Sequence, residues 1–371
     1  MVDTSESKLR NEEDVEDLNE IEEVLPSSFS ITSYGADYPV DGLVKRVTRK
    51  DIVIPVFSLD PEEGQSTVNF QREFVWRKTQ ADRFIESLLL GLPVPGIFLV
   101  KESDGKHLVL DGQQRLRTLE SFYNGIFQGK EYHLENVQDQ WKGKTYKTLH
   151  PDDRRRLDDS IIHATIVRQD EPTEDQSSIY LIFERLNSGA TFLQPQEIRV
   201  ALYHGPFVSL LSKLNTTPAW RVLYGKKSPR LKDIELILRF FALFYHSTNY
   251  RRPMKDFLNR YMAQNRLLTR QPADTLKELF EKTVTTILRS IGARAFRPKS
   301  AVNAAVLDSI MVGVATAVES GNLTSDANIK SAYAQLLLDQ DYIDSTTRAT
   351  ADEESIRTRL RLARSAFISS E

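Results

Sequence analysis

The hydrophobic positions of the chain follow two patterns that meet near residue 174. Before that point, short apolar runs of strand length alternate with amphipathic stretches. After it, apolar residues recur three and four positions apart, as they do on one face of a helix. This change predicts an α+β protein, in which a small α/β domain precedes a mostly α-helical domain.

Several local signals place the elements of the first part. Thr79 is expected to cap a helix with Asp82, and Gly91 with the prolines after it ends that helix. A further helix follows Arg115 and ends at Asn124-Gly125, whereas residues 130–160 are expected to form an irregular polar insertion. The expected strands cover residues 51–59, 97–100, 107–110 and 161–167, the second and third joined as a hairpin across Ser103-Asp104-Gly105.

The second part predicts a series of helices. Ile179 and Phe183 lie on the apolar face of the first one, and Pro195 begins the next, where its missing N–H is harmless. Later helical patterns cover residues 206–215, 231–246, 254–265, 273–291, 301–319, 328–340 and 352–368.

The predicted domains are residues 1–45, 46–172 and 173–371. The first 25 residues hold ten acidic side chains against Lys8 and Arg10, and no aromatic side chain. Such a segment buries little apolar surface to offset the entropy of ordering it. We therefore expect residues 1–45 to be an acidic, flexible segment.

Composition narrows the chemistry. The chain has 371 residues, a formal net charge of −3 and no cysteine, which excludes disulfides, thiolate zinc sites and cysteine nucleophiles. The six histidines are scattered, so each is first interpreted as an ordinary core or surface residue. The start is polar and acidic, unlike a signal peptide, and the most apolar stretch is shorter than a membrane span. These features predict a soluble, cytoplasmic protein.

One short string differs from ordinary packing. An apolar strand ends in Asp111-Gly112-Gln113-Gln114-Arg115, and a helix begins there. Helix N-termini attract anions because their first N–H groups are unpaired and the helix dipole is positive at that end. The simpler interpretation is an aspartate cap, a turn glycine and two solvated amides. The rarity of the whole string favours a nucleotide or phosphate site.

The residue types at this turn suit phosphoryl transfer to water. Arg115, and Arg72 further upstream, match phosphate oxygens with their guanidinium groups. Asp111 is the candidate ligand of Mg²⁺ or the group that polarises water, and Gln113 or Gln114 orients the nucleophile. The sequence contains no glycine-rich loop of the Gly-Lys-Ser/Thr type, which excludes a conventional P-loop.

Further candidates are weaker. Phe70, which neighbours Gln71 and Arg72, is a candidate for stacking on a base or touching DNA. The run Arg154-Arg155-Arg156 is a candidate phosphate contact for DNA, with a solvated helix face as the simpler interpretation.

The string at 111–115 and its flanks resemble the N-terminal domain of GmrSD-type modification-dependent restriction enzymes, within the ParB/sulfiredoxin-like superfamily. Residues 68–76 (VNFQREFVW) and 89–95 (LLGLPVP) resemble two upstream motifs of that family. Residues 183–190 (FERLNSGA), with Gln196-Glu197-Ile198-Arg199, resemble its second signature. The resemblance covers roughly residues 50–205.

This resemblance implies a ParB-like α/β domain that binds and hydrolyses a nucleoside triphosphate with Mg²⁺, in bacterial defence against phage or foreign DNA. Carried over by motif, the catalytic residues are Asp111, Gln113, Gln114 and Arg115, with Asp111 also the metal ligand. The implied nucleotide-binding residues are Gln71, Arg72, Gly112, Arg185, Asn187, Glu197 and Arg199. The second signature is expected to close over the site from the helical domain, or else to serve only helix capping and an ion pair.

Family members sense modified DNA, and cleavage usually belongs to a separate H-N-H-type nuclease domain or subunit. The scattered histidines of this chain form no such cluster. A partner nuclease and an oligomeric assembly are therefore both compatible with the resemblance. Three alternatives stay open, namely a non-catalytic ParB-like DNA-binding module, a self-sufficient metal-dependent DNA nuclease, and a regulatory scaffold that only binds nucleotide.

Overall fold

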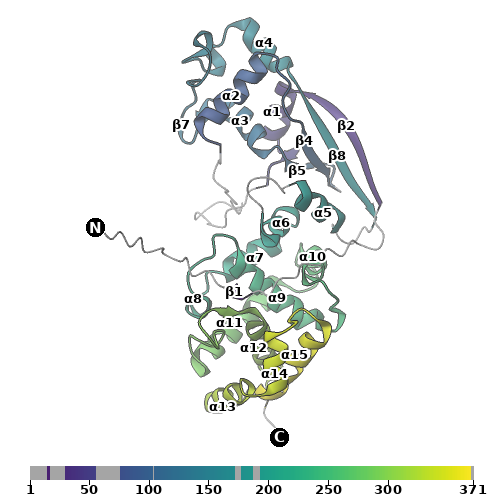
Figure 1. Cartoon of the computed structure of the whole chain (residues 1–371), viewed down its shortest axis with the longest axis vertical. Helices are drawn as coiled ribbons and strands as arrows, with labels where there is room; N and C mark the ends of the chain where they lie inside the picture. The colour runs from purple at the N-terminus through teal and green to yellow at the C-terminus, as the bar shows by residue number, and fades with distance from the viewer. Residues whose placement is uncertain are drawn as a thin grey trace, which may run out of the picture. The chain divides into compact units, whose positions relative to one another are not determined.

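The computed structural model (Figure 1) describes residues 15–16, 30–55, 76–102, 104–171, 177–186 and 193–368. The chain divides into two compact units. One consists of Pro26–Leu202, and the other combines Tyr203–Glu371 with Met1–Leu25. Each unit is described by itself.

The first unit is built on a mixed five-stranded sheet. Its strand order is β2 (Ser30–Pro39), β8 (Ile161–Glu171), β4 (Ile97–Lys101), β5 (His107–Asp111) and β3 (Ile52–Val53). The pairs β2–β8 and β4–β5 are antiparallel, and the pairs β8–β4 and β5–β3 are parallel. The predicted hairpin and the predicted strand at 161–167 are confirmed. Of the predicted strand at 51–59, the structure has Ile52–Val53, and residues 56–59 lie outside the described ranges.

Four helices gather on one face of this sheet (Figure 1), namely α1 (Val40–Thr48), α2 (Lys78–Leu89), α3 (Gln113–Asn124) and α4 (Pro151–Asp159). Because side chains alternate along a strand, Ile97, Leu99 and Val109 point toward these helices and join their core. Leu108 and Leu110 point to the opposite face and are also buried. There α5 (Ser177–Leu186) contacts β5 and β8, and α6 (Pro195–Leu202) contacts α5.

The structure differs from three expectations for this unit. The segment expected to be flexible up to residue 45 includes β2 and most of α1, which carry Val40 and Leu43 into the core. Helix α2 begins after Arg77 and not after Thr79, because the side-chain Oε1 of Gln80 accepts the Arg77 N–H at 3.0 Å. Its compact unit also extends to Leu202, about thirty residues beyond the predicted boundary, so that α5 and α6 belong with the sheet.

The expectation of an irregular insertion at 130–160 is wrong. Within it lie β7 (Lys130–Glu131), which pairs with β6 (Ile126–Phe127), two short 3₁₀ helices, η1 (Asp139–Trp141) and η2 (Tyr146–Thr148), and α4. Its few apolar side chains are spaced irregularly, yet Tyr132, Leu134, Trp141, Leu149 and Leu157 are all buried in the core. The buried carboxylate of Asp82 fixes the segment by accepting the N–H groups of Glu135 and Asn136 at 3.2 and 3.0 Å.

The second unit is helical, as expected. The strand β9 (Val302–Asn303) pairs with β1 (Val15–Glu16). The helix α12 (Ala304–Glu319) contacts α9 (Lys232–His246), α11 (Ala273–Ser290) and α15 (Glu353–Phe367). The helix predicted at 328–340 corresponds to α13, and the structure adds α8 and α14, which the sequence did not predict. Its helices are α7 (Pro206–Leu214), α8 (Pro218–Tyr224), α9 (Lys232–His246), α10 (Met254–Asn265), α11 (Ala273–Ser290), α12 (Ala304–Glu319), α13 (Asp326–Leu336), α14 (Gln340–Thr347) and α15 (Glu353–Phe367), with the 3₁₀ helix η3 (Ser247–Asn249).

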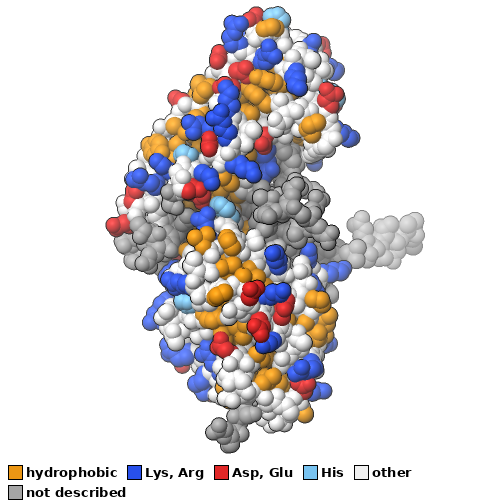
Figure 2. Space-filling model, turned by 180° about the vertical axis from the view of Figure 1, so that it is seen from behind, with side chains coloured by type: hydrophobic (Ala, Val, Ile, Leu, Met, Phe, Trp, Pro, Cys, Tyr) orange, Lys and Arg blue, Asp and Glu red, His pale blue; other side chains and the backbone are white. Residues whose placement is uncertain are grey.

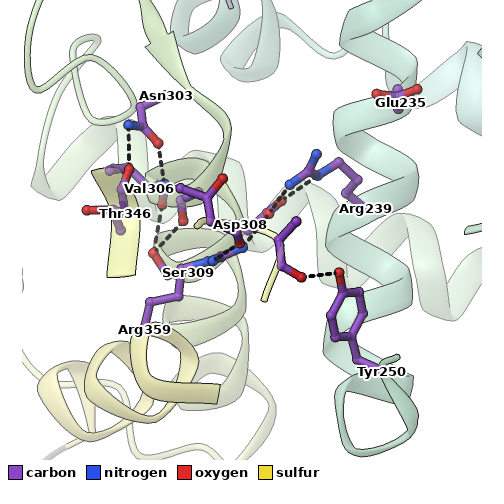
Figure 3. A network of polar contacts seen from close by, with 12 residues as sticks. Glu235, Arg239, Tyr250, Asn303, Val306, Asp308, Ser309, Thr346 and Arg359 are labelled. Atoms are coloured by element: carbon purple, nitrogen blue, oxygen red, sulfur yellow. Dashed lines mark hydrogen bonds and ion pairs between the residues drawn. The ribbon is translucent and has the colours of Figure 1, made fainter. Parts of the chain in front are cut away.

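A buried charge cluster joins three of these helices (Figure 3). The carboxylate of Asp308 on α12 accepts Nη2 of Arg239 on α9 at 2.8 Å and Nη2 of Arg359 on α15 at 3.5 Å. Arg359 also donates to the carbonyls of Ser345 and Thr350. Removing one partner from such a cluster leaves uncompensated buried charge, so it ties the helices into one arrangement.

Charged side chains of both signs are intermingled on the face seen in Figure 2. Among the described residues, no helix has the length and apolar character needed to cross a membrane.

Candidate functional site

The turn between β5 and α3 requires glycine at position 112. Gly112 has φ 95° and ψ 10°, in the left-handed region that other residues rarely adopt. A Cβ added there would also collide with the Cγ2 atom of Ile97 and lie 3.0 Å from its Cβ. The backbone of the turn therefore packs directly on the buried start of β4.

The first turn of α3 presents unpaired N–H groups. Within the described ranges no side chain caps the helix, and its first backbone bond runs from the Leu116 N–H to the Gly112 carbonyl. The N–H groups of Gln113, Gln114 and Arg115 precede that bond, where a helix binds anions. The half-buried Gln113 side chain makes no hydrogen bond to the described residues, whereas the side-chain Oε1 of Gln114 accepts the Trp76 N–H at 3.4 Å.

Arg115 is held against the turn and does not extend into solvent. Its Nη2 donates to the carboxylate of Asp111 at 2.9 Å and to the carbonyl of Gly96 at 2.8 Å. The Arg115 side chain is only 14% exposed, and its buried Nε has no hydrogen-bond partner among the residues that the structure describes. The Asp111 side chain is 47% exposed and keeps its other oxygen outside this pair. A carboxylate, a guanidinium and a helix N-terminus thus meet at one corner.

Two charged residues on α3 were missed by the sequence analysis. Arg117 and Glu120 lie four and seven positions after Gln113, a spacing that puts all three on one side of the helix. Arg117 donates to the carbonyl of Pro55 at 3.3 Å. Burial raises the pKa of Glu120, opposed by the nearby charge of Arg117, and burial lowers the pKa of Arg117. The spacing from Gln113 was the signal that could have identified them.

The second signature lies in the same compact unit as the turn. Arg185 is exposed near the end of α5, the helix that contacts β5. Glu197 is buried and accepts the Gln194 N–H at 2.6 Å, which caps the start of α6. Arg199 is 1% exposed and donates to the Gln196 side chain at 3.1 Å. The expectation that this signature comes from the separate helical unit is therefore corrected.

Four predicted site residues, Phe70, Gln71, Arg72 and Asn187, lie outside the described residues. The predicted DNA contacts Arg154, Arg155 and Arg156 lie on α4, whose four aspartates outnumber its three arginines.

Two of these arginines have partners within the fold. Arg155 pairs with Asp152 at 3.6 Å, and Arg156 donates to the Leu89 carbonyl at 3.2 Å. The helix is thus an acidic element with internal pairing. Across the described residues, no group of three His, Cys, Asp or Glu side chains is placed to hold a metal ion.

Residues 58–204 match a family described as GmrSD restriction endonuclease, N-terminal domain. This part of the chain is similar to the N-terminal domain of GmrSD restriction endonucleases. The match includes the β5–α3 turn, α5 and α6, and it begins after β2, α1 and β3. A search of curated proteins and one of solved structures give no match to the chain.

Proposed function

We propose that this GmrSD-type protein works in a restriction system against foreign DNA, in the cytoplasm, and that its β5–α3 turn binds and hydrolyses a nucleoside triphosphate. The family match supports a role in restriction. The geometry of the turn is the observation that carries the nucleotide site. An assignment to the ParB/sulfiredoxin-like superfamily is part of the same proposal.

The turn offers a phosphate chain three kinds of contact. The N–H groups at the start of α3 would donate hydrogen bonds to phosphate oxygens, and Gly112 lets the backbone approach these oxygens without a side chain in the way. Arg115 brings positive charge to the same corner through a guanidinium group, which suits phosphate oxygens. Gln113 is free to hold a water with its amide.

Asp111 fits the role of a single Mg²⁺ ligand. Magnesium in nucleotide enzymes is commonly bound by one or two carboxylates, with phosphates and waters completing its shell. One oxygen of Asp111 is bonded to Arg115 and the other is available at a half-exposed position. When bound, the ion would neutralise phosphate charge.

A panel of nucleoside triphosphates with Mg²⁺, with and without modified DNA, tests this proposal through phosphate release. Asp111→Asn and Gln113→Ala should abolish or strongly reduce phosphate release. Neither side chain supports the core, so such a loss would report on the site and not on the fold. Gln335→Ala, an exposed glutamine on α13, is the matched control and should keep wild-type turnover. Arg115→Ala is less decisive by itself, since it also removes the bonds to Gly96 and Asp111. Wild-type turnover in both Asp111→Asn and Gln113→Ala would refute the site.

Measurements of DNA binding and DNA nicking, made beside phosphate release, separate the alternatives. A non-catalytic DNA-binding module predicts DNA affinity with steep salt dependence and no phosphate release. A self-sufficient nuclease predicts metal-dependent nicking by the lone chain that Asp111→Asn removes. We favour coupling of nucleotide hydrolysis to DNA sensing or to a partner nuclease, and either of those results would replace it.

A further inference from the structure

An aspartate–histidine pair lies on the sheet near the proposed site. Asp37 on β2 and His163 on β8 are directly opposite each other in the antiparallel register. The Nδ1 atom of His163 lies 2.8 Å from an Asp37 carboxylate oxygen, and the two side chains are 61% and 67% exposed. Nε2 of His163 has no hydrogen-bond partner in the described part of the chain and remains accessible.

The imidazole ring is positioned by a second contact. A Cβ added at Gly35 would lie 2.9 Å from Cε1 and 3.3 Å from Nε2 of His163. The ring therefore rests on the bare backbone of Gly35, while Asp37 holds its Nδ1 edge. The φ of Gly35 lies outside the left-handed region, so its backbone conformation does not require glycine. A side chain at this position would instead press on the ring of His163.

The pair lies on β2 and β8, at one edge of the sheet, and the turn follows β5 of the same sheet. Strand β4 lies between β5 and β8, with Phe98 opposite Asp111 of β5 and Ile97 opposite Ala164 of β8. Because β4 and β8 are parallel, the residues one position earlier, Gly96 and His163, lie level with each other. The strand of Asp111 is two strand spacings, about 10 Å, from that of His163. A Cβ on Gly96 would lie 2.7 Å from the His163 carbonyl, and the Gly96 carbonyl accepts Arg115. Gly96 thus connects the pair to the Arg115–Asp111 corner.

His163 also faces the side of the sheet that α5 partly covers. Its neighbours Ile162 and Ala164 point into the four-helix core, so the alternation of the strand turns His163 to the opposite face. Phe98 and Thr165 are half-exposed, so the sheet stays open near the pair. His163 and the turn after Asp111 therefore lie at the same end of the sheet.

We propose that His163 is the general base of the nucleotide hydrolysis, with Asp37 as its positioning residue. This proposal rests on the proposed function. The Nε2 atom takes a proton from a water whose oxygen forms a bond to the terminal phosphorus. The bond from that phosphorus to the bridging oxygen breaks, and its electron pair leaves with the nucleoside diphosphate. The proton then passes from His163 to solvent.

The hydrogen bond to Asp37 explains the assignment of atoms. A carboxylate can only accept, so it selects the tautomer with the proton on Nδ1 and leaves a lone pair on Nε2. Asparagine at position 37 can instead donate to Nδ1, which puts the proton on Nε2 and removes the base. Histidine is the side chain most often used as a general base, and such bases contribute about 10²–10⁴-fold to a rate.

The test measures phosphate release and nucleotide affinity of the full chain with Mg²⁺ in four variants. His163→Ala should lower the turnover number about 10²–10⁴-fold with little change in affinity, and added imidazole should restore part of it. His163→Gln should be equally slow, and Asp37→Asn should be slow although its fold and nucleotide affinity are retained. The control is His150→Ala, which removes a similarly exposed histidine near Asp152 on α4 and should leave turnover unchanged.

The outcomes separate the two proposals. If the wild-type chain releases no phosphate from any nucleotide, the proposed function fails and the role of His163 fails with it. If the wild type is active and His163→Ala or Asp37→Asn retains its rate within about twofold, the nucleotide site stands and the base is wrong. Loss of nucleotide affinity in His163→Ala, without rescue by imidazole, would also overturn the assignment.

Discussion

Substituting Gly112 by alanine should destabilise the first unit through two separate effects. The backbone at this position has φ 95°, so any side chain is strained there. The new methyl would also press on Ile97, which is fully buried at the start of β4. Neither neighbour can move easily, because Ile97 lies in the core and Gly112 is fixed between a strand and a helix.

The two effects have similar size. A non-glycine residue held in the left-handed region costs about 1–3 kcal/mol. Adding a methyl to a well-packed core costs about 1–3 kcal/mol more. We therefore expect Gly112→Ala to lower the free energy of unfolding by about 2–6 kcal/mol, a large part of the 5–15 kcal/mol typical of a domain.

Urea unfolding at equilibrium measures this loss, and Gly125→Ala provides the matched control. Gly125 follows α3 with φ 77°, but a Cβ there would meet nothing within 4 Å. It reports the backbone strain alone, so the difference between the two variants isolates the contact with Ile97. In a protein that already carries Ile97→Ala, adding Gly112→Ala should lower the free energy of unfolding by less than it does in the wild type, because the new methyl then has space.

Equal losses in Gly112→Ala and Gly125→Ala would refute the packing argument. A Gly112→Ala protein as stable as the wild type would refute the strain argument as well. In either case the tight approach of the turn to β4 would not constrain the proposed nucleotide site.

The remaining predictions concern stability in each unit. Asp308→Asn should lower the free energy of unfolding by about 3–5 kcal/mol, because the buried guanidinium groups of Arg239 and Arg359 lose the negative charge of Asp308. Asp326→Asn breaks an exposed ion pair and should lower the free energy of unfolding in urea far less than Asp308→Asn. Equal losses in the two variants would contradict the argument. Burial, with help from Arg46 and Lys101, lowers the pKa of His107, so the folded state favours its neutral form. The stability this gives is present above the pKa of the unfolded chain and is lost as the pH falls through the folded pKa. His107→Gln should therefore flatten the decline in stability between about pH 7 and pH 5, and a profile as steep as that of the wild type would contradict this.

Local signals predicted those parts of the fold in which neighbours in sequence are neighbours in space. The hairpin of β4 and β5 and the end of α3 follow from short apolar runs, Asp104-Gly105 and Asn124-Gly125, whereas α3 begins at Gln113 and not after Arg115. The corner at Asp111 was predictable for the same reason, since its five residues are contiguous.

Parts that depend on distant pairing were not predictable. The edge strand β2 is mostly exposed on both faces and therefore lacks the alternation that marks a half-buried strand. Its partner β8 lies more than a hundred residues later, and only their pairing brings Asp37 to His163. Gly96 likewise gains its role from Arg115, nineteen residues away. The core residues of 130–160 were hidden by their irregular spacing among polar side chains.

The position of β2 has a practical consequence for anyone who shortens this protein. A fragment that starts where the family match starts, at residue 58, would lose both β2 and α1. Strand β8 would then expose a long row of backbone donors and acceptors that natural sheets normally shield from other chains. The core would also lose Val40 and Leu43, so the boundary drawn from sequence similarity cuts through a folded body. Such a fragment should aggregate, whereas one that begins before residue 30 retains the strand that seals this edge.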